Sequence, residues 1–266
     1  MKKTILITGS TDGIGKLTAI KFAKEGHDVY LHGRNPKKLS DAISEVKSLS
    51  KNDNIKGFVA DFSALDSVRK LARQIIKELP KIDVLINNAG VFKSSSPFNK
   101  DGLDMRIVVN YLAPYLLTKE LIPLLNKGIE PRILNLSSAA QSSVDYDVLS
   151  GKKQEHEQEA YAQSKLALTM WSFYLAEKVQ NIAVIAVNPG SLLNTKMVME
   201  AYGNSWSSAD KGANILFDLA ISDDYKNMTG AYYDNDTKGF EAAHSDAYDE
   251  VKIETLIKVT TSMLTA

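Results

Sequence analysis

The sequence predicts an α/β protein built as a three-layer, doubly wound parallel sheet. Short apolar runs alternate along the chain with longer amphipathic stretches. The apolar runs are continuous, as in strands that helices cover on both faces. A length of 266 residues suits one α/β domain with a large core. Because we find no repeat, low-complexity tract or linker, we expect residues 1–266 to form a single domain.

Seven apolar runs are the predicted strands: TILIT at 4–8, then 28–33, 55–60, 83–87, 132–137, 183–188 and 230–234. Helical periodicity predicts the intervening and following helices: 14–25, 36–50, 64–79, 102–126, 159–180, 208–221 and 246–264. Strand–helix alternation at this spacing gives parallel strands with helices on both faces. In such folds ligands bind at the carboxyl edge of the sheet.

Composition argues against several functions. The 32 basic and 32 acidic residues give zero net charge, so we expect no nucleic-acid partner and no attraction to anionic membranes. The chain has no cysteine, which excludes disulfides and thiolate chemistry. The four histidines are scattered, so we expect no metal site: His27, His32, His156 and His244. No apolar run reaches the roughly 18 residues of a membrane span, and the N-terminus reads as a strand, so we expect a cytoplasmic protein.

A glycine-rich turn follows the first predicted strand directly and opens the first helix. Its sequence is TGSTDGIG, residues 8–15. The first glycine gap is longer than in the G-x-G-x-x-G dinucleotide fingerprint, but the physics is the same. Backbone without Cβ can approach a pyrophosphate, and a helix N-terminus supplies amide groups and a positive dipole. The predicted phosphate-binding residues are Gly9, Ser10, Thr11, Asp12, Gly13, Ile14 and Gly15.

The end of the second strand, LHGRN at 31–35, indicates which dinucleotide is bound. Nucleotide folds usually place an acidic residue here to hold the ribose 2′-hydroxyl. This chain has Gly33 followed by Arg34 and Asn35. A guanidinium can bind a 2′-phosphate bidentately, whereas a carboxylate would repel it. We therefore expect NADP(H) to be preferred over NAD(H).

Residues 139–160 form a polar, charged segment between a strand and the next helix. The segment is long for such a connection, which usually has roughly 2–6 residues. It is either a solvated surface insertion or a flap over the ligand site at the carboxyl edge of the sheet. The sequence leaves both interpretations open.

Tyr161 and Lys165 lie four positions apart in AYAQSKLAL, a spacing that puts both side chains on one helix face. A lysine beside a phenol can lower the pKa of the phenol toward working pH. The same spacing occurs three more times, at Tyr115/Lys119, Tyr174/Lys178 and Tyr248/Lys252. The spacing by itself therefore identifies no site.

The order of motifs along nearly the whole chain resembles the short-chain dehydrogenase/reductase family. The motifs are TGSTDGIG, Asp61 after the third strand, INNAG at 86–90, Asn110, LNLSS ending at Ser138, YAQSK at 161–165 and NPG at 188–190. The long segment before Tyr161 and the Arg34-Asn35 pair resemble the retinol-dehydrogenase-like branch of that family. The resemblance implies a Rossmann-type fold and an oxidoreductase that interconverts a carbonyl compound and its alcohol by hydride transfer.

The resemblance also selects the catalytic residues. It implies that Tyr161 exchanges the proton with the substrate oxygen, its pKa lowered by Lys165. Ser138 would hydrogen-bond that oxygen, and we choose it over Ser137 because the family's functional serine is the second of the two. Lys165 would also hold the nicotinamide ribose. Asn110 would anchor a water that relays protons.

Further cofactor contacts follow from the same resemblance. Asp61 and Phe62 would lie near adenine. The NNAG motif would support the sheet and touch the adenosine ribose; Asn87 and Asn88 are both candidates, and we select Asn87 with Ala89 and Gly90. After Pro189 and Gly190 the family has a threonine that contacts the carboxamide; Asn194 stands at the usual distance here, and we select Thr195, one residue further.

A non-catalytic NADP(H)-binding regulator on the same fold is the alternative function, since a fold does not fix a function. The serine, tyrosine and lysine, all present, favour the enzyme. The substrate is expected to be a small carbonyl compound or alcohol of unspecified identity. The resemblance further implies a possible homodimer or homotetramer formed through the long helices, although the apolar stretch at 166–176 suits core packing equally well.

Overall fold

The computed structural model describes residues 1–265, except the side chain of residue 202, and its centre is one twisted sheet. The described strands are β1 (Thr4–Ile7), β2 (Asp28–Gly33), β3 (Ile55–Val59), β4 (Val84–Asn87), β5 (Arg132–Leu136), β6 (Ala183–Asn188), β7 (Ala231–Asp234) and β8 (Gly239–Glu241). Their order is β3-β2-β1-β4-β5-β6-β7-β8, and all neighbours pair in parallel except β7 and β8. The doubly wound α/β class is confirmed, and the antiparallel β8 is an addition to the prediction.

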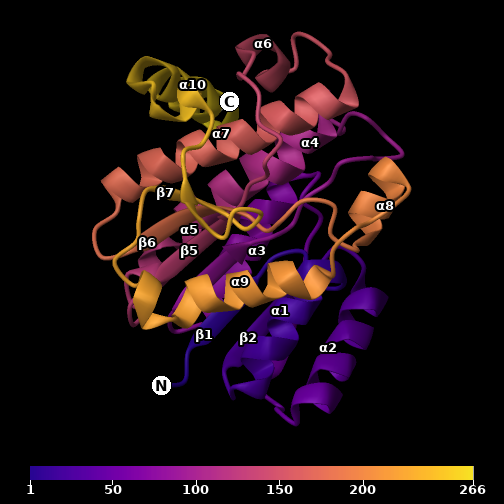
Figure 1. The fold of residues 1–266 in the computed structure, drawn as a ribbon, viewed down its shortest axis with the longest axis vertical. Helices are drawn as coiled ribbons and strands as arrows, with labels where there is room; N and C mark the ends of the chain where they lie inside the picture. The colour runs from indigo at the N-terminus through magenta and orange to yellow at the C-terminus, as the bar shows by residue number, and fades with distance from the viewer. Residues whose placement is uncertain (266) are drawn as a thin grey trace.

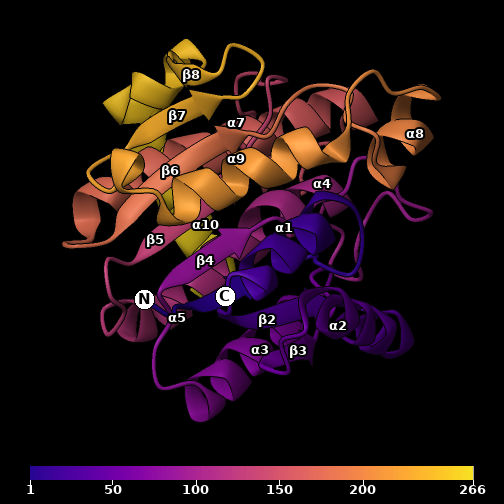
Figure 2. The same ribbon diagram turned by 60° about the horizontal axis from the view of Figure 1, so that its bottom comes forward.

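Helices cover both faces of this sheet, as Figures 1 and 2 show. The helices are α1 (Gly13–Lys24), α2 (Pro36–Ser50), α3 (Leu65–Glu78), α4 (Met105–Ile107), α5 (Ala113–Leu125), α6 (Tyr146–Leu149), α7 (Glu157–Lys178), α8 (Lys196–Tyr202), α9 (Ala209–Ile221) and α10 (Glu250–Thr265). Helices α1, α2 and α9 pack on one face, and α3, α5 and α7 on the other. Helix α10 lies outside α7 (Figure 1). Each face therefore has its own apolar core.

Local sequence explains where α1 and α2 begin. Asp12 is the N-cap of α1, and its carboxylate accepts a hydrogen bond from the amide of Gly13 at 2.7 Å. Asn35 is the N-cap of α2, its side-chain oxygen accepts from the amide of Lys38 at 3.0 Å, and Pro36 occupies the first turn. Both helices thus start at the carboxyl edge of the sheet.

The helix predicted at 102–126 begins later and is irregular. Gly102 lies in a bend at φ +78°, Asp104 forms an isolated antiparallel bridge with Phe98, and α4 starts at Met105 with Asp104 as its N-cap. A five-residue π-helix, Val108–Leu112, then joins α4 to α5. Such a π-bulge inserts an extra residue into the helix and commonly occurs at functional sites. Asn110 lies within it.

The 139–160 segment is partly core. Its short helix α6 buries Val148 and Leu149, which are 1% and 0% exposed. Asp145 caps this helix, and the hydroxyl of Tyr146 donates to the carbonyl of Lys252 at 3.0 Å, which ties the segment to α10. A fully solvated insertion is therefore the wrong description of 146–149.

The C-terminal helix α10 packs over the face formed by α7 and the π-helix. The hydroxyls of Tyr111 and Thr260 are 2.7 Å apart in the interior. Between α7 and α5, Trp171 is buried against Tyr115, with ring centroids 5.4 Å apart. The apolar part of α7 thus serves the core of its own chain. None of the helices within residues 1–265 is both long and apolar enough to span a membrane.

Candidate active site

The carboxyl ends of β1, β4, β5 and β6 meet at one edge of the sheet. The glycine loop follows β1, the INNAG motif ends β4, the serine pair follows β5, and NPG ends β6. Parallel pairing alone brings these four motifs together, although the first ends at residue 15 and the last begins at residue 188.

The glycine loop packs tightly against the end of β4. Gly9 has φ +61°, and a Cβ on it would lie 2.6 Å from the Cα of Ala89. A Cβ on Gly15 would collide with the side chain of Asn88 and the carbonyl of Gly9. Asn88 donates from Nδ2 to the carbonyls of Thr8 at 2.9 Å and Gly9 at 2.8 Å. Both glycines are thus required for packing within the protein.

The remaining glycine of the loop, Gly13, faces away from that packing. Gly13 has φ +54°, and a Cβ there would find only the side chain of Thr195, at 3.7 Å or more. It stands at the first position of α1, where the helix dipole and the amides of the first turn favour an anion, and its own amide donates to the Asp12 carboxylate. A backbone cradle of this kind, open at a helix N-terminus, fits a dinucleotide pyrophosphate.

His32 supports the glycine loop from the end of β2. Its Nδ1 accepts from the amide of Gly9 at 3.1 Å, so its Nε2 carries the proton and donates to the carbonyl of Ala60 at 3.1 Å. Burial lowers the pKa of His32 to about 4, which keeps the ring neutral near pH 7. The neutral tautomer fixes the loop at its first glycine.

The strand ends beside the loop carry the residues predicted to bind adenosine. Gly33 lies so close to Thr11 of the glycine loop that a Cβ on it would collide with the Thr11 side chain. Arg34, the next residue, therefore lies beside the glycine loop and is exposed. The side-chain oxygen of Asn35 is used as the α2 cap, and Asp61 is exposed. Phe62 is buried, and its ring stacks on His32 at 4.3 Å, which leaves its backbone for a ligand.

Tyr161 and Lys165 lie together on α7, beside Gly90. Lys165 Nζ is 5.5 Å from the centroid of the Tyr161 ring, and the same ring packs on Phe92 at 4.8 Å. Lys165 is 5% exposed and donates from Nζ to the carbonyl of Leu136 at 2.7 Å. A Cβ on Gly90 would lie 3.7 Å from Nζ.

Burial distinguishes this pair from the other tyrosine–lysine pairs. Lys178 Nζ lies 5.1 Å from the Tyr174 ring centroid, a similar geometry, but it stands on the surface, whereas Lys165 is in the interior. Burial lowers the pKa of Lys165 to about 8. An ammonium out of water acts more strongly on a nearby phenol than an exposed one does.

The two serines after β5 have different environments. Ser137 is buried, and its hydroxyl contacts Thr169 Oγ1 at 2.7 Å and the carbonyl of Lys165 at 3.2 Å. Ser138 is half-buried, and its Oγ accepts from the amide of Ala140 at 3.1 Å. Ser137 therefore joins α7 to β5, and Ser138 is the serine that solvent reaches.

Asn110 links the loop after β4 to α7. Its Oδ1 accepts from the amide of Val91 at 2.8 Å, and its Nδ2 donates to the carbonyl of Val91 and to Ser164 Oγ, both at 3.0 Å. Ser164 Oγ in turn donates to the carbonyl of Tyr161 at 2.6 Å. The role of Asn110 in binding a water molecule stays a prediction.

Asn87, predicted as a cofactor contact, points into the core. Its Nδ2 donates to Thr118 Oγ1 at 3.0 Å and to Asn135 Oδ1 at 2.7 Å. Its neighbour Asn88, the alternative candidate, is the residue that holds the glycine loop.

The loop after β6 is held by a carboxylate that the sequence did not identify. Asp236 accepts from the amide and hydroxyl of Ser191, and from Asn188 Nδ2 at 3.1 Å and Lys211 Nζ at 3.2 Å. Burial is the largest single effect and raises the pKa of Asp236, but the hydrogen bonds from these donors together outweigh it and lower the pKa to about 2. Pro189 and Gly190 (φ +118°) lie in the loop so fixed.

Thr195 continues this loop toward the glycine turn. It is the N-cap of α8, where its Oγ1 accepts from the amide of Val198 at 3.3 Å. Its methyl group faces the position of Gly13. Thr195 thus lies near the phosphate loop, and the exposed Asn194 has its amide bonded to the carbonyl of Ser207 at 2.7 Å.

Polar partners brought in from distant elements were beyond the motif analysis. They are Thr8, His32, Asn88, Ser164 and Asp236. Thr8, His32, Asn88 and Ser164 stand inside quoted motifs, which was the available signal, whereas Asp236 lies outside them.

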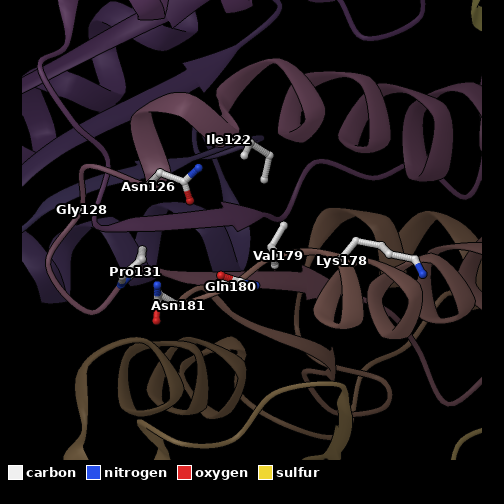
Figure 3. A pocket seen from close by; sticks show the side chains of 8 residues that line it. All are labelled: Ile122, Asn126, Gly128, Pro131, Lys178, Val179, Gln180 and Asn181. Atoms are coloured by element: carbon white, nitrogen blue, oxygen red, sulfur yellow. The ribbon is translucent and has the colours of Figure 1, made fainter.

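The cavity drawn in Figure 3 is elsewhere. It has a volume of about 380 Å³ and is lined by residues such as Asn126, Pro131 and Asn181, which precede β5 and β6. It therefore opens at the amino edge of the sheet, opposite the four motifs. Within residues 1–265 no group of three or more histidine or acidic side chains is arranged to hold a metal ion.

Comparison with known proteins agrees with this geometry. The short chain dehydrogenase family model matches residues 3–205. The chain is 31% identical to mouse retinol dehydrogenase 13, over 87% of this chain and 75% of that protein. It is 27% identical, with a TM-score of 0.73, to an Escherichia coli CFT073 short chain dehydrogenase crystallised with NADPH; 88% of this chain and 96% of that chain are covered. The chain belongs to the short-chain dehydrogenase/reductase family of oxidoreductases, and its relatives include the retinol-dehydrogenase-like branch.

The neutral state of His32 predicts an acid-sensitive fold. An unfolded histidine binds its proton near pH 6.5, whereas the folded pKa is about 4. Between these values the unfolded chain binds the extra proton, so stability falls as pH drops through this window. We expect His32 to lower the free energy of unfolding by about 3 kcal/mol across this window, since each unit of pKa shift corresponds to about 1.4 kcal/mol.

Urea unfolding followed by circular dichroism at pH 7 and pH 4 measures this loss. His32→Gln, less stable at pH 7 but unable to titrate, should show a correspondingly smaller decrease. An equal decrease in both proteins would place the acid sensitivity in other groups.

Proposed function

We propose that this protein is an NADP(H)-dependent oxidoreductase that interconverts a carbonyl compound and its alcohol. The observation that carries the proposal is the convergence of Tyr161, the buried Lys165 and the half-buried Ser138 beside a glycine cradle at one sheet edge. The name of the mouse relative, retinol dehydrogenase, supports an alcohol or carbonyl substrate.

Proton transfer is assigned to Tyr161. When bound, the nicotinamide supplies or accepts the hydride. During reduction the phenol donates its proton to the substrate oxygen, and during oxidation the phenolate takes it back. The Lys165 ammonium, 5.5 Å from the ring centroid, favours the phenolate and so eases proton release. Phe92, packed on the ring, limits its movement.

Ser138 and Lys165 complete the chemistry. The Ser138 hydroxyl stabilises the negative charge that develops on the substrate oxygen. Lys165 Nζ has one bond to the carbonyl of Leu136 and further N–H groups that can hold the nicotinamide ribose. Asn110 holds the loop that carries Gly90 close to this ammonium. Residues 139–160 border the substrate side and follow Ser138 directly.

NADP(H) is the proposed cofactor because Arg34 stands where a carboxylate would select NAD(H). Its backbone position, one residue after the contact between Gly33 and Thr11, suits a 2′-phosphate next to the glycine loop. The E. coli relative crystallised with NADPH supports this choice.

A non-catalytic NADP(H) sensor is the alternative. A sensor needs the glycine cradle and a lysine that holds the ribose, but it has no use for a tyrosine and a half-buried serine beside that lysine. Burying an ammonium is costly, and perturbed groups of this kind concentrate at catalytic sites. NADPH consumption with a panel of aldehydes, ketones and quinones separates the two functions.

Tyr161→Phe tests the proton assignment. The variant keeps the ring and its packing on Phe92, so folding and NADPH binding should persist. The substrate oxygen loses its proton donor, and kcat should fall by about 10⁴-fold or more. The measurement is kcat with the best substrate of the panel, with NADPH binding followed by fluorescence.

Tyr174→Phe is the matched control, because Tyr174 also has a lysine four residues later on the same helix. Its kcat should stay within a few-fold of normal. Near-normal turnover in Tyr161→Phe, or an equal loss in Tyr174→Phe, would refute the assignment.

Arg34→Ala tests the cofactor choice. A charge-assisted hydrogen bond contributes about 1.5–3 kcal/mol, so the unmodified enzyme should prefer NADPH over NADH roughly 10- to 150-fold in kcat/KM. The variant should lose most of this preference without losing NADH activity. Equal efficiency with both cofactors before mutation would contradict the role of Arg34.

A further inference from the structure

Ser138 stands beyond the part of β5 that the sheet holds in place. The strand ends at Leu136, so the ladder to β4 and β6 fixes the backbone only to that point. A catalytic hydroxyl must nevertheless be held closely in its working geometry. Some other contact has to fix this peptide.

The carbonyl of Ser138 accepts two side-chain hydrogen bonds. Gln141 donates from Nε2 at 2.9 Å, and Tyr232 donates from its hydroxyl at 3.1 Å. The Gln141 Oε1 accepts from the amide of His244 at 3.3 Å, which fixes the orientation of its side-chain amide. One donor thus comes from the segment after Ser138 and the other from β7.

Tyr232 is a rigid anchor for such a bond. It is 4% exposed, and its register in β7 places it opposite Ala186 of β6, on the α7 side of the sheet. Burial raises the pKa of Tyr232 well above its ordinary value, so the hydroxyl keeps its proton. Tyr233, the next residue, lies on the other face, with its ring against Phe240 at 5.2 Å.

We propose that Tyr232, with Gln141, is a positioning residue that fixes the Ser138 peptide and thereby aims the Ser138 hydroxyl at the substrate oxygen. The proposal rests on the function proposed above. It assigns no contact with substrate or cofactor to Tyr232, which acts through Ser138 alone.

Tyr232→Phe removes one hydroxyl and leaves the ring. We expect kcat with the best substrate of the panel to fall roughly 3- to 10-fold, the size of one hydrogen bond. Because the slowed step is the chemical one, the primary isotope effect with NADPH deuterated at the transferred position should rise. NADPH affinity and Tm should stay close to normal. Tyr233→Phe is the matched control and should leave kcat and the isotope effect unchanged.

A double-mutant cycle separates positioning from a general structural role. In a Ser138→Ala background there is no hydroxyl to aim, so Tyr232→Phe should cause no further loss of kcat. An equal further loss there, or an unchanged kcat in the single Tyr232→Phe variant, would overturn the proposal. Failure of the proposed function is recognised separately, because Tyr161→Phe would then retain its turnover.

Discussion

A buried ammonium group is the constraint around which this site is organised. Lys165 is almost fully enclosed, and its Nζ is bonded to the last carbonyl of β5, at Leu136. An ammonium out of water is unfavourable unless it is hydrogen-bonded, so α7 must dock where that carbonyl lies. The bond between Ser137 and the backbone of Lys165 holds the same junction from the strand side. Docking of α7 in turn places Tyr161 over the edge of the sheet.

Side-chain bonds to backbone shape the rest of the site. Asn88 holds the glycine loop, Asn110 holds the loop after β4, and Asp236 holds the loop after β6. In each case a polar side chain fixes a main-chain segment at the carboxyl edge of the sheet, where we propose that the cofactor binds. Asn87 and Phe62 differ from these residues, because their side chains pack inward, against Thr118 and Asn135 and against His32, although their motifs lie at the same edge of the sheet. The side chains to which we assign chemistry are accordingly few: Tyr161, Ser138 and Lys165.

Much of the fold was predictable because local sequence patterns determine it. Buried parallel strands have continuous apolar sequences, and the glycine turn after β1 indicates a ligand site. The three-residue β8 and the π-helix were not predictable, since neither has a periodic signal of its own. His32 and Tyr232 were missed for a different reason: their partners, Gly9 and Ser138, are 23 and 94 residues away in the chain. Only the register of the sheet brings such pairs into contact.

Binding of NADPH as a function of pH tests the role of the buried ammonium most directly. The pKa of Lys165 in the free protein is lowered to about 8, so the group is charged below that pH and neutral above it. Fluorescence titrations between pH 7 and pH 10 should therefore show NADPH affinity falling above about pH 8. Lys165→Met should bind NADPH more weakly at pH 7 and lack this decline. The same decline in Lys165→Met, or none in the unmodified protein, would contradict the account.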